Sequence, residues 1–175
     1  MANNPARRRR VLRRSAISLL WICLLAVPRV VQGANNCAWL NEATASGLLG
    51  GDSVGNVSAV VGEPTVCTFT QVSAIAKRTL RVTVEIAADA HARLVVLAKG
   101  CGTDAASLKA IGNEALVCVI YDRMAGLGER VVGRVRDQVF TITISSTLKS
   151  DSILNRDALK SRVYIAAEQV AGNLF

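Results

Sequence analysis

The sequence predicts an α+β fold in which helices cover one face of a mainly antiparallel sheet, in two layers that disulfides staple together. Three observations predict it: strands of alternating apolar and polar residues in both halves of the chain, three segments of helical periodicity, and four cysteines beyond residue 33. The expected order of elements is α-β-β-α-β-β-β-α. All of them fall within residues 34–175, which we expect to form a single domain.

The domain is expected to begin with a helix over residues 38–49, which Gly50 and Gly51 bring to an end. Residues 51–64 are rich in Gly, Ser and Asn, and this composition is typical of a loop. Within that loop, the sequence leaves room for a short strand near residues 57–61.

Two strands and a helix follow the loop. Residues 66–71 alternate between two faces, and residues 79–86 alternate most clearly of all, as a half-buried antiparallel strand does. The apolar side of this second strand consists of Leu80, Val82, Val84 and Ile86. The period then changes, and residues 89–99 predict a helix with Asp89 as its N-cap and Gly100 at its end.

The second half is expected to contain three strands and a long helix. Residues 115–121 predict one strand, and residues 130–136 and 138–145 predict a hairpin. Its core-facing positions are Phe140, Ile142 and Ile144. Residues 155–172 predict an amphipathic helix that Asn155 caps. The apolar stripe of this helix consists of Leu159, Val163, Ala166, Ala167 and Val170.

The N-terminal segment has the pattern of an export signal. A run of arginines in residues 7–14 precedes an apolar stretch in residues 15–27, and small residues lead to Gly33. The apolar core is about 12 residues long, whereas a membrane-spanning helix needs about 20. We therefore expect cleavage after Gly33 and delivery to the periplasm or the extracellular space. The alternative is an uncleaved anchor, which Pro28 and Arg29 would interrupt.

The distribution of charge argues against a nucleic-acid partner. The formal net charge of the chain is +8, but residues 1–33 hold seven arginines and no lysine or acidic residue. Of the 21 basic residues, 14 remain in the domain against 13 acidic ones, which leaves a net charge of +1. Without a basic domain, nucleic-acid binding loses its electrostatic basis. Membrane contact is expected only through the N-terminal signal.

The four cysteines of the domain predict two disulfides, because an even number in an exported chain is typical of disulfide pairing. Of the three possible pairings, Cys37–Cys67 with Cys101–Cys118 is favoured. The first pair would join the N-terminal helix to an early strand, and the second would close a loop of 17 residues. A zinc site is the alternative, but the spacings of 30, 34 and 17 residues contain no Cys-x-x-Cys cluster.

One candidate binding site stands out. Arg130, Arg134 and Arg136 recur at even spacing along a predicted strand, so their side chains are expected on one face. Guanidinium groups bind phosphate and carboxylate groups well, so these three arginines could bind an anionic ligand such as a phosphate or a cell-wall polymer, but the alternative is the favoured interpretation. The alternative is an ordinary solvated strand face, paired with Glu129 and Asp137 nearby.

No catalytic residue, cofactor site or metal site can be assigned from the sequence. The chain has a single histidine, His91, which beside Asp89 is better interpreted as a solvated helix residue than as a functional group. Asp104 and Glu114 are the best available pair of carboxylates for hydrolysis, but nothing in the sequence fixes their geometry. We expect no bound cofactor and no metal ion.

Several short motifs resemble a family of small exported bacterial envelope domains of unknown function. Many of its members are lipoproteins, and the family is distantly similar to the extracytoplasmic sensor domains of bacterial Ser/Thr kinases. The resemblance implies an α+β fold and a Cys37–Cys67 bridge, and it implies no catalytic residues. This chain lacks the lipobox of the common pattern. The motifs are Cys37-Ala38-Trp39-Leu40, Leu48-Leu49-Gly50-Gly51, Cys67-Thr68-Phe69, Ile111-Gly112-Asn113-Glu114-Ala115 and residues 132–140.

The sequence thus predicts an exported envelope protein, monomeric, that acts as a non-enzymatic ligand-binding or sensing domain for an envelope ligand or protein. Two alternatives stay open at this point. One is an envelope hydrolase with an unrecognised carboxylate site, and the other is an inhibitor-like module that binds another protein.

Overall fold

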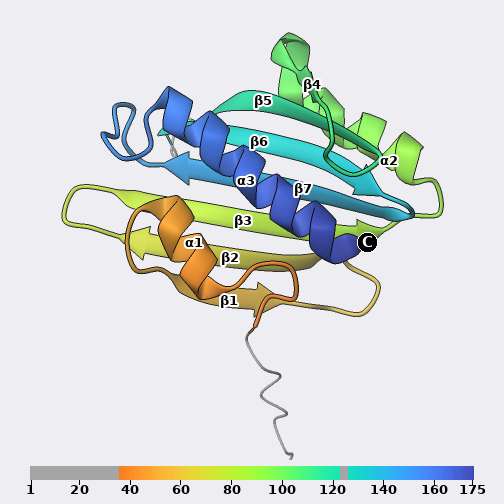
Figure 1. Cartoon of the computed structure of the whole chain (residues 1–175), viewed down its shortest axis with the longest axis horizontal. Helices are drawn as coiled ribbons and strands as arrows, with labels where there is room; N and C mark the ends of the chain where they lie inside the picture. Colours follow the sequence, from red (N-terminus) through yellow and green to blue (C-terminus); the bar gives the residue numbers. More distant parts are fainter. Residues whose placement is uncertain (1–35, 123–125) are drawn as a thin grey trace, which may run out of the picture. The chain divides into compact units, whose positions relative to one another are not determined.

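The computed structural model describes residues 36–122 and 126–175, which belong to one compact unit (Figure 1). The predicted export signal and its cleavage site lie outside the described residues. The elements are α1 (Glu42–Leu49), β1 (Val54–Ser58), β2 (Thr65–Val72), β3 (Lys77–Ile86), α2 (Ala90–Ala98), the 3-10 segment η1 (Lys99–Asp104), β4 (Ala106–Leu108), β5 (Glu114–Asp122), β6 (Gly126–Val135), β7 (Gln138–Ser146) and α3 (Arg156–Leu174).

The strands form one antiparallel sheet in the order β1-β2-β3-β7-β6-β5-β4. The predicted α+β class is therefore confirmed, but the element order is not the expected one. The expected sequence of elements lacked β1 and β4, the two edge strands of the sheet. Both are short, β1 contains Gly55 and Asn56, and neither has the apolar alternation from which a strand is predicted.

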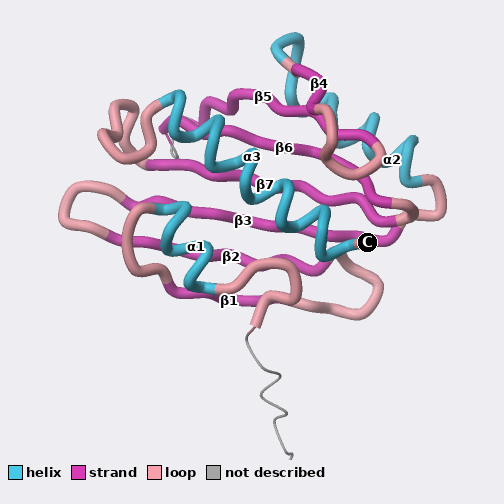
Figure 2. The backbone as a smooth tube through the Cα atoms, viewed as in Figure 1, coloured by secondary structure: helices cyan, strands magenta, loops and turns pink. Residues whose placement is uncertain are grey.

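The helices lie on both faces of the sheet, which corrects the expected two-layer arrangement. Helix α3 lies over β6 and β7, and α1 lies over β2 and β3 on the same face (Figures 1 and 2). Helix α2 instead packs through Ala90 and Leu94 against Cys118, Val132 and Val139. These three strand residues alternate with residues of the main core, so α2 covers the opposite face.

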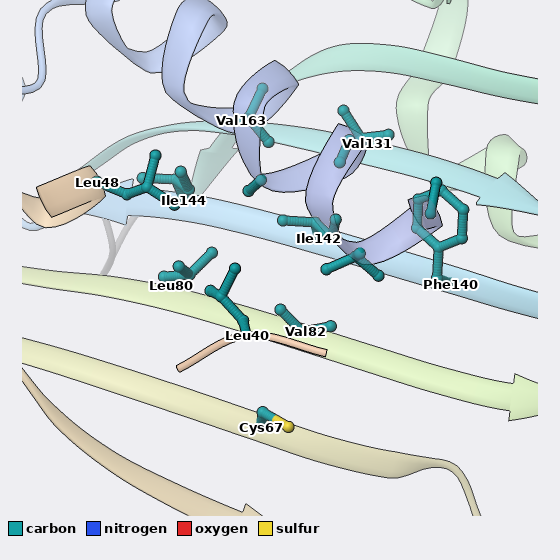
Figure 3. Close-up of a cluster of buried hydrophobic side chains, with 14 of the residues drawn as sticks. Leu40, Leu48, Cys67, Leu80, Val82, Val131, Phe140, Ile142, Ile144 and Val163 are labelled. Carbon is teal, nitrogen blue, oxygen red and sulfur yellow. The ribbon is translucent and has the colours of Figure 1, made fainter. Parts of the chain in front are cut away.

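The main core lies between the sheet and the pair α1 and α3, and Figure 3 shows part of it. The predicted core positions Leu80, Val82, Val84, Phe140, Ile142 and Ile144 are buried, as is the predicted stripe of α3 along its whole length. Ile86 is the exception: it is the last residue of β3, beyond the cover of α1 and α3, and it is 78% exposed. Position 133 on β6 must be a glycine. A Cβ atom there would overlap the ring of Phe140, which has no exposed surface. Phe140 thus packs directly on the backbone of β6.

A buried ion pair stabilises one end of the main core. The Arg78 guanidinium on β3 donates to both carboxylate oxygens of Asp151, at 2.7 and 2.9 Å, and to Gln71 Oε1 at 2.9 Å. The Ser146 hydroxyl and two backbone N–H groups also donate to Asp151. Burial acts to raise the pKa of Asp151, but the hydrogen bonds from Arg78 and Ser146 hold it well below the ordinary value of 3.8.

Candidate ligand-binding face

The second face of the sheet is only partly covered. Helix α2 and η1 lie over β5, β6 and the adjoining end of β7, and no other helix within residues 36–122 and 126–175 lies on this face. Paired residues of neighbouring strands lie on the same face, so the registers arrange the side chains in rows across the sheet. One row runs through Asn56, Thr68, Arg81, Thr143, Arg130 and Cys118. The rows beside it are Val54, Thr70, Thr79, Ser145, Gly128 and Ile120, and Ser58, Val66, Thr83, Thr141, Val132 and Leu116.

We call the part of these rows on β2, β3, β6 and β7 the hydroxyl face, and η1 lies beside Arg130 at its β6 edge. Its polar members on β2, β3, β6 and β7 are Thr68, Thr70, Thr79, Arg81, Thr83, Arg130, Thr141, Thr143 and Ser145. All of them are half-buried except Arg81, which is exposed. The three rows contain no acidic residue. The sheet therefore presents a rigid surface of hydroxyl groups with two guanidinium groups in its middle row.

Acidic residues occur in the next row along the strands, and both of them are engaged. Glu85 of β3 accepts hydrogen bonds from Arg93 of α2, at 2.7 and 3.1 Å. Glu114 of β5 accepts from Arg134 at 2.5 and 2.9 Å and lies 3.0 Å from Nδ1 of His91. The hydrogen bond from Arg134 is the main reason why the pKa of Glu114 lies below its ordinary value. The contacts of Glu85 with Arg93 and of Glu114 with His91 join α2 to the sheet. Both carboxylates are therefore engaged and do not neutralise the arginines of the middle row.

The structure does not gather the three predicted arginines into one site. Arg130 and Arg134 lie on the same face with Val132 between them, but Arg134 is paired with Glu114. Arg136 lies in the β6–β7 turn with a φ of 55°, and its guanidinium sits 5.8 Å from the ring centre of Phe175. Of the three, Arg130 alone belongs to the hydroxyl face.

The two acidic residues expected to neutralise a solvated arginine face lie elsewhere. Glu129 alternates with Arg130 along β6, so it faces the main core, where it is 5% exposed. Burial raises the pKa of Glu129 above its ordinary value, although Lys160 and Arg156 of α3 act to lower it. Asp137 is exposed in the β6–β7 turn. Neither residue belongs to the rows of the hydroxyl face.

Arg130 lies against η1. The position that a Cβ atom would take on Gly100 of η1 is 3.2 Å from the Nη1 atom of Arg130. Its Nε atom is buried and has no hydrogen-bond partner within the part of the chain that the structure describes. Arg81 was not singled out in the sequence, where it is one polar residue in an alternating strand. The pairing of β3 with β7 and of β7 with β6 brings it into the row of Arg130.

Two hollows lie outside the hydroxyl face. One, of about 400 Å³, surrounds the start of α2 and is lined by residues that include His91, Arg134, Arg136 and Asp137. The N-terminus of α2 is already capped there, because Asp89 accepts a hydrogen bond from the N–H of Ala92 at 2.8 Å. The charges around this hollow are mixed in sign.

The second hollow is an apolar groove of about 340 Å³ between α3 and strands β4 and β5. Leu108, Val117, Tyr164 and Ile165 contribute most of its apolar lining. Asp157, Lys160 and Ser161 of α3 also line it. Its chemistry suits an apolar group rather than an anion.

The candidate carboxylate pair is not assembled as a hydrolytic site. Glu114 is engaged by Arg134 and His91, as described above. Asp104 is exposed at the end of η1, where it accepts a hydrogen bond from the Thr103 hydroxyl at 3.4 Å. No group of three or more metal-ligating side chains occurs in residues 36–122 and 126–175.

Both predicted disulfides are present. Cys37–Cys67 joins the segment before α1 to β2, and Cys101–Cys118 joins η1 to β5. The second bridge fixes η1 beside Arg130, since Cys118 and Arg130 are paired residues of β5 and β6. Among the described residues, no helix is long and apolar enough to cross a membrane.

Comparison with known proteins gives no relative: no family model, no curated protein and no solved structure matches the chain.

Proposed function

We propose that the chain is an exported bacterial envelope protein that acts as a non-enzymatic binding or sensing domain and uses the hydroxyl face as its binding surface. The observation that carries the proposal is the composition of this face. Hydroxyl groups and guanidinium groups stand in register on four paired strands, with no carboxylate among them. A surface held by a rigid sheet loses little conformational entropy when a ligand binds.

Export is supported by two independent features. The N-terminal segment has the pattern of a secretory signal. Two disulfides are typical of proteins in an oxidising compartment, such as the periplasm or the extracellular space. The resemblance of several motifs to exported envelope domains points the same way.

A monomer is supported by the edges of the sheet. The edge strands β1 and β4 are five and three residues long, and short edge strands give a second chain little backbone to pair with. A ligand on the hydroxyl face would be held by one chain alone.

Export predicts a defined mature protein. When the full chain is expressed in a bacterium, the form recovered outside the cytoplasm is expected to begin at Ala34 and to be lighter by four hydrogens than its reduced form. Intact mass spectrometry before and after reduction measures both properties. Recovery of the chain in the membrane with residues 1–33 attached would contradict cleavage and support the anchored alternative.

Binding on the hydroxyl face predicts where ligand contacts fall. When soluble envelope polymers are added to the isotope-labelled exported protein, the largest amide shifts are expected on β3, β6 and β7 of that face. Thr143→Val removes one hydroxyl hydrogen bond and is expected to weaken binding about fivefold. The matched control is Thr65→Val, because Thr65 lies on β2 beside Cys67 and Phe69 of the opposite face.

The same titration tests a second candidate function, binding of a protein partner in the apolar groove beside α3. The observation that favours it is the apolar lining supplied by Leu108, Val117 and Ile165. Shifts confined to these residues, with Thr143→Val binding as well as the wild type, would overturn the proposal for the hydroxyl face.

A further inference from the structure

We propose that the middle row of the hydroxyl face, Arg81–Thr143–Arg130, binds the phosphate groups of a phosphodiester-linked envelope polymer. This inference rests on the proposed function and names its ligand class. The row brings together two arginines from β3 and β6 with a hydroxyl group of β7 between them. Two observations support the inference. The row carries two positive charges, and no acidic side chain of the described residues pairs with either of them.

The arginines of the described residues differ in whether they already have a partner. Arg78, Arg93 and Arg134 are each paired with a carboxylate. Arg156 donates to the Tyr121 hydroxyl, Arg162 donates to the Leu48 carbonyl, and Arg136 lies over the Phe175 ring. Among the arginines of residues 36–122 and 126–175, Arg81 and Arg130 are the two with no ion pair, no side-chain hydrogen bond and no contact with an aromatic ring. These two uncompensated guanidinium groups share one row.

The spacing of the row suits one tetrahedral oxyanion. Neighbouring strands lie about 4.8 Å apart, so the Cα atoms of Arg81 and Arg130, two strands apart, are separated by about 10 Å. The Arg81 side chain is exposed, the Arg130 side chain is half-buried with its Nη1 atom beside Gly100, and Thr143 lies between the two arginines in the row. A phosphate group above Thr143 would accept hydrogen bonds from both guanidinium groups and from the hydroxyl group. Guanidinium binds phosphate with paired, charge-assisted hydrogen bonds.

The preference for a polymer follows from the rest of the face. The hydroxyl groups of Thr79 and Ser145 on one side of the row, and of Thr83 and Thr141 on the other, offer hydrogen bonds to the neutral parts of a chain that lies across the sheet. A membrane surface would be favoured by several lysines and by apolar side chains able to enter the lipid. In the middle row, the charged side chains are two arginines and the rest are small and polar. This composition favours a hydrated polymer over a lipid bilayer.

The test is a titration of the exported protein with poly(glycerol phosphate) of defined length, followed through the side-chain Nε–H resonances of Arg81 and Arg130. Both resonances are expected to shift. Arg81→Gln and Arg130→Gln are each expected to weaken binding at least about tenfold, because each removes charged hydrogen bonds to the phosphate. Lys149→Gln, which removes one positive charge from an exposed loop, is the matched control and is expected to bind as the wild type.

The remaining arms separate this inference from the proposed function. Inorganic phosphate is expected to shift the same two resonances at higher concentration, since it supplies one phosphate group instead of many. Equal binding of a neutral N-acetylglucosamine oligomer on the hydroxyl face would overturn the phosphate assignment and leave the proposed function standing. Tighter binding to vesicles of anionic lipid than to the polymer would overturn the assignment in favour of a membrane. Unchanged affinity in both Gln variants, with their thermal unfolding unaltered, would also overturn it.

Discussion

Replacing Asp151 by asparagine is expected to destabilise the domain by about 3–5 kcal/mol, the cost of breaking a buried ion pair. The side chains of Arg78 and Asp151 are 4% and 1% exposed. Without the carboxylate, the Arg78 guanidinium stays charged and buried, and its side-chain acceptors are then two neutral amide oxygens, that of Gln71 and that of the introduced asparagine. The free energy of unfolding in urea at pH 7, compared between the wild type and Asp151→Asn, measures this effect.

The matched control is Asp52→Asn, since Asp52 is an exposed aspartate just before β1. This change is expected to alter the free energy of unfolding by no more than about 0.5 kcal/mol. A loss of less than about 1 kcal/mol in Asp151→Asn would show that the ion pair contributes little, and would contradict the assignment.

The Arg78–Asp151 ion pair also predicts that the free energy of unfolding depends on pH in the acid range. The pKa of Asp151 is lower in the folded protein than in the unfolded chain, where it takes its ordinary value of 3.8. The stabilisation is therefore fully present above about pH 4 and is lost as the pH falls below that value, because the unfolded chain then binds a proton that the folded protein does not. The free energy of unfolding, measured from pH 6 to pH 2, is expected to fall less steeply in Asp151→Asn than in the wild type.

Local pattern is sufficient to predict the central elements of this fold. The strand around Val82, the strand around Ile142 and the long helix that Asn155 caps all have a clear apolar period, and each buries the side that the period indicates, except for Ile86 at the end of its strand. The cysteine pairing is also predicted, since the number of cysteines and their spacing leave few arrangements.

The features that could not be predicted from the sequence depend on which strands lie next to each other in the sheet. The alternation of residues 79–86 indicates that Arg81 lies on a polar face, but not which strand lies next to it. Arg81 and Arg130 share a row because β7 lies between β3 and β6. Similarly, the apolar side of α2 indicates that it packs on the sheet but not on which face. The candidate site therefore becomes visible only when the strand order is known.

Removing a disulfide is the second change with a large expected effect. In the chain-entropy account, a crosslink stabilises by restricting the unfolded chain, and the gain grows with the length of the closed loop. The separation of 30 residues between Cys37 and Cys67 gives about 3.6 kcal/mol. The separation of 17 residues between Cys101 and Cys118 gives about 3.1 kcal/mol. Replacing each pair by alanines is expected to lower the free energy of unfolding by these amounts, measured in urea at 25 °C.

The two variants are expected to differ in ligand binding, although they lose similar amounts of stability. Loss of Cys101–Cys118 frees η1, whose Gly100 lies against the Arg130 guanidinium, so the variant should bind poly(glycerol phosphate) more weakly than the wild type under conditions where both are folded. Loss of Cys37–Cys67, on the side of the sheet that α1 covers, should leave that affinity unchanged. Equal affinity in both variants would show that η1 does not position Arg130 and that β6 alone holds it in the row.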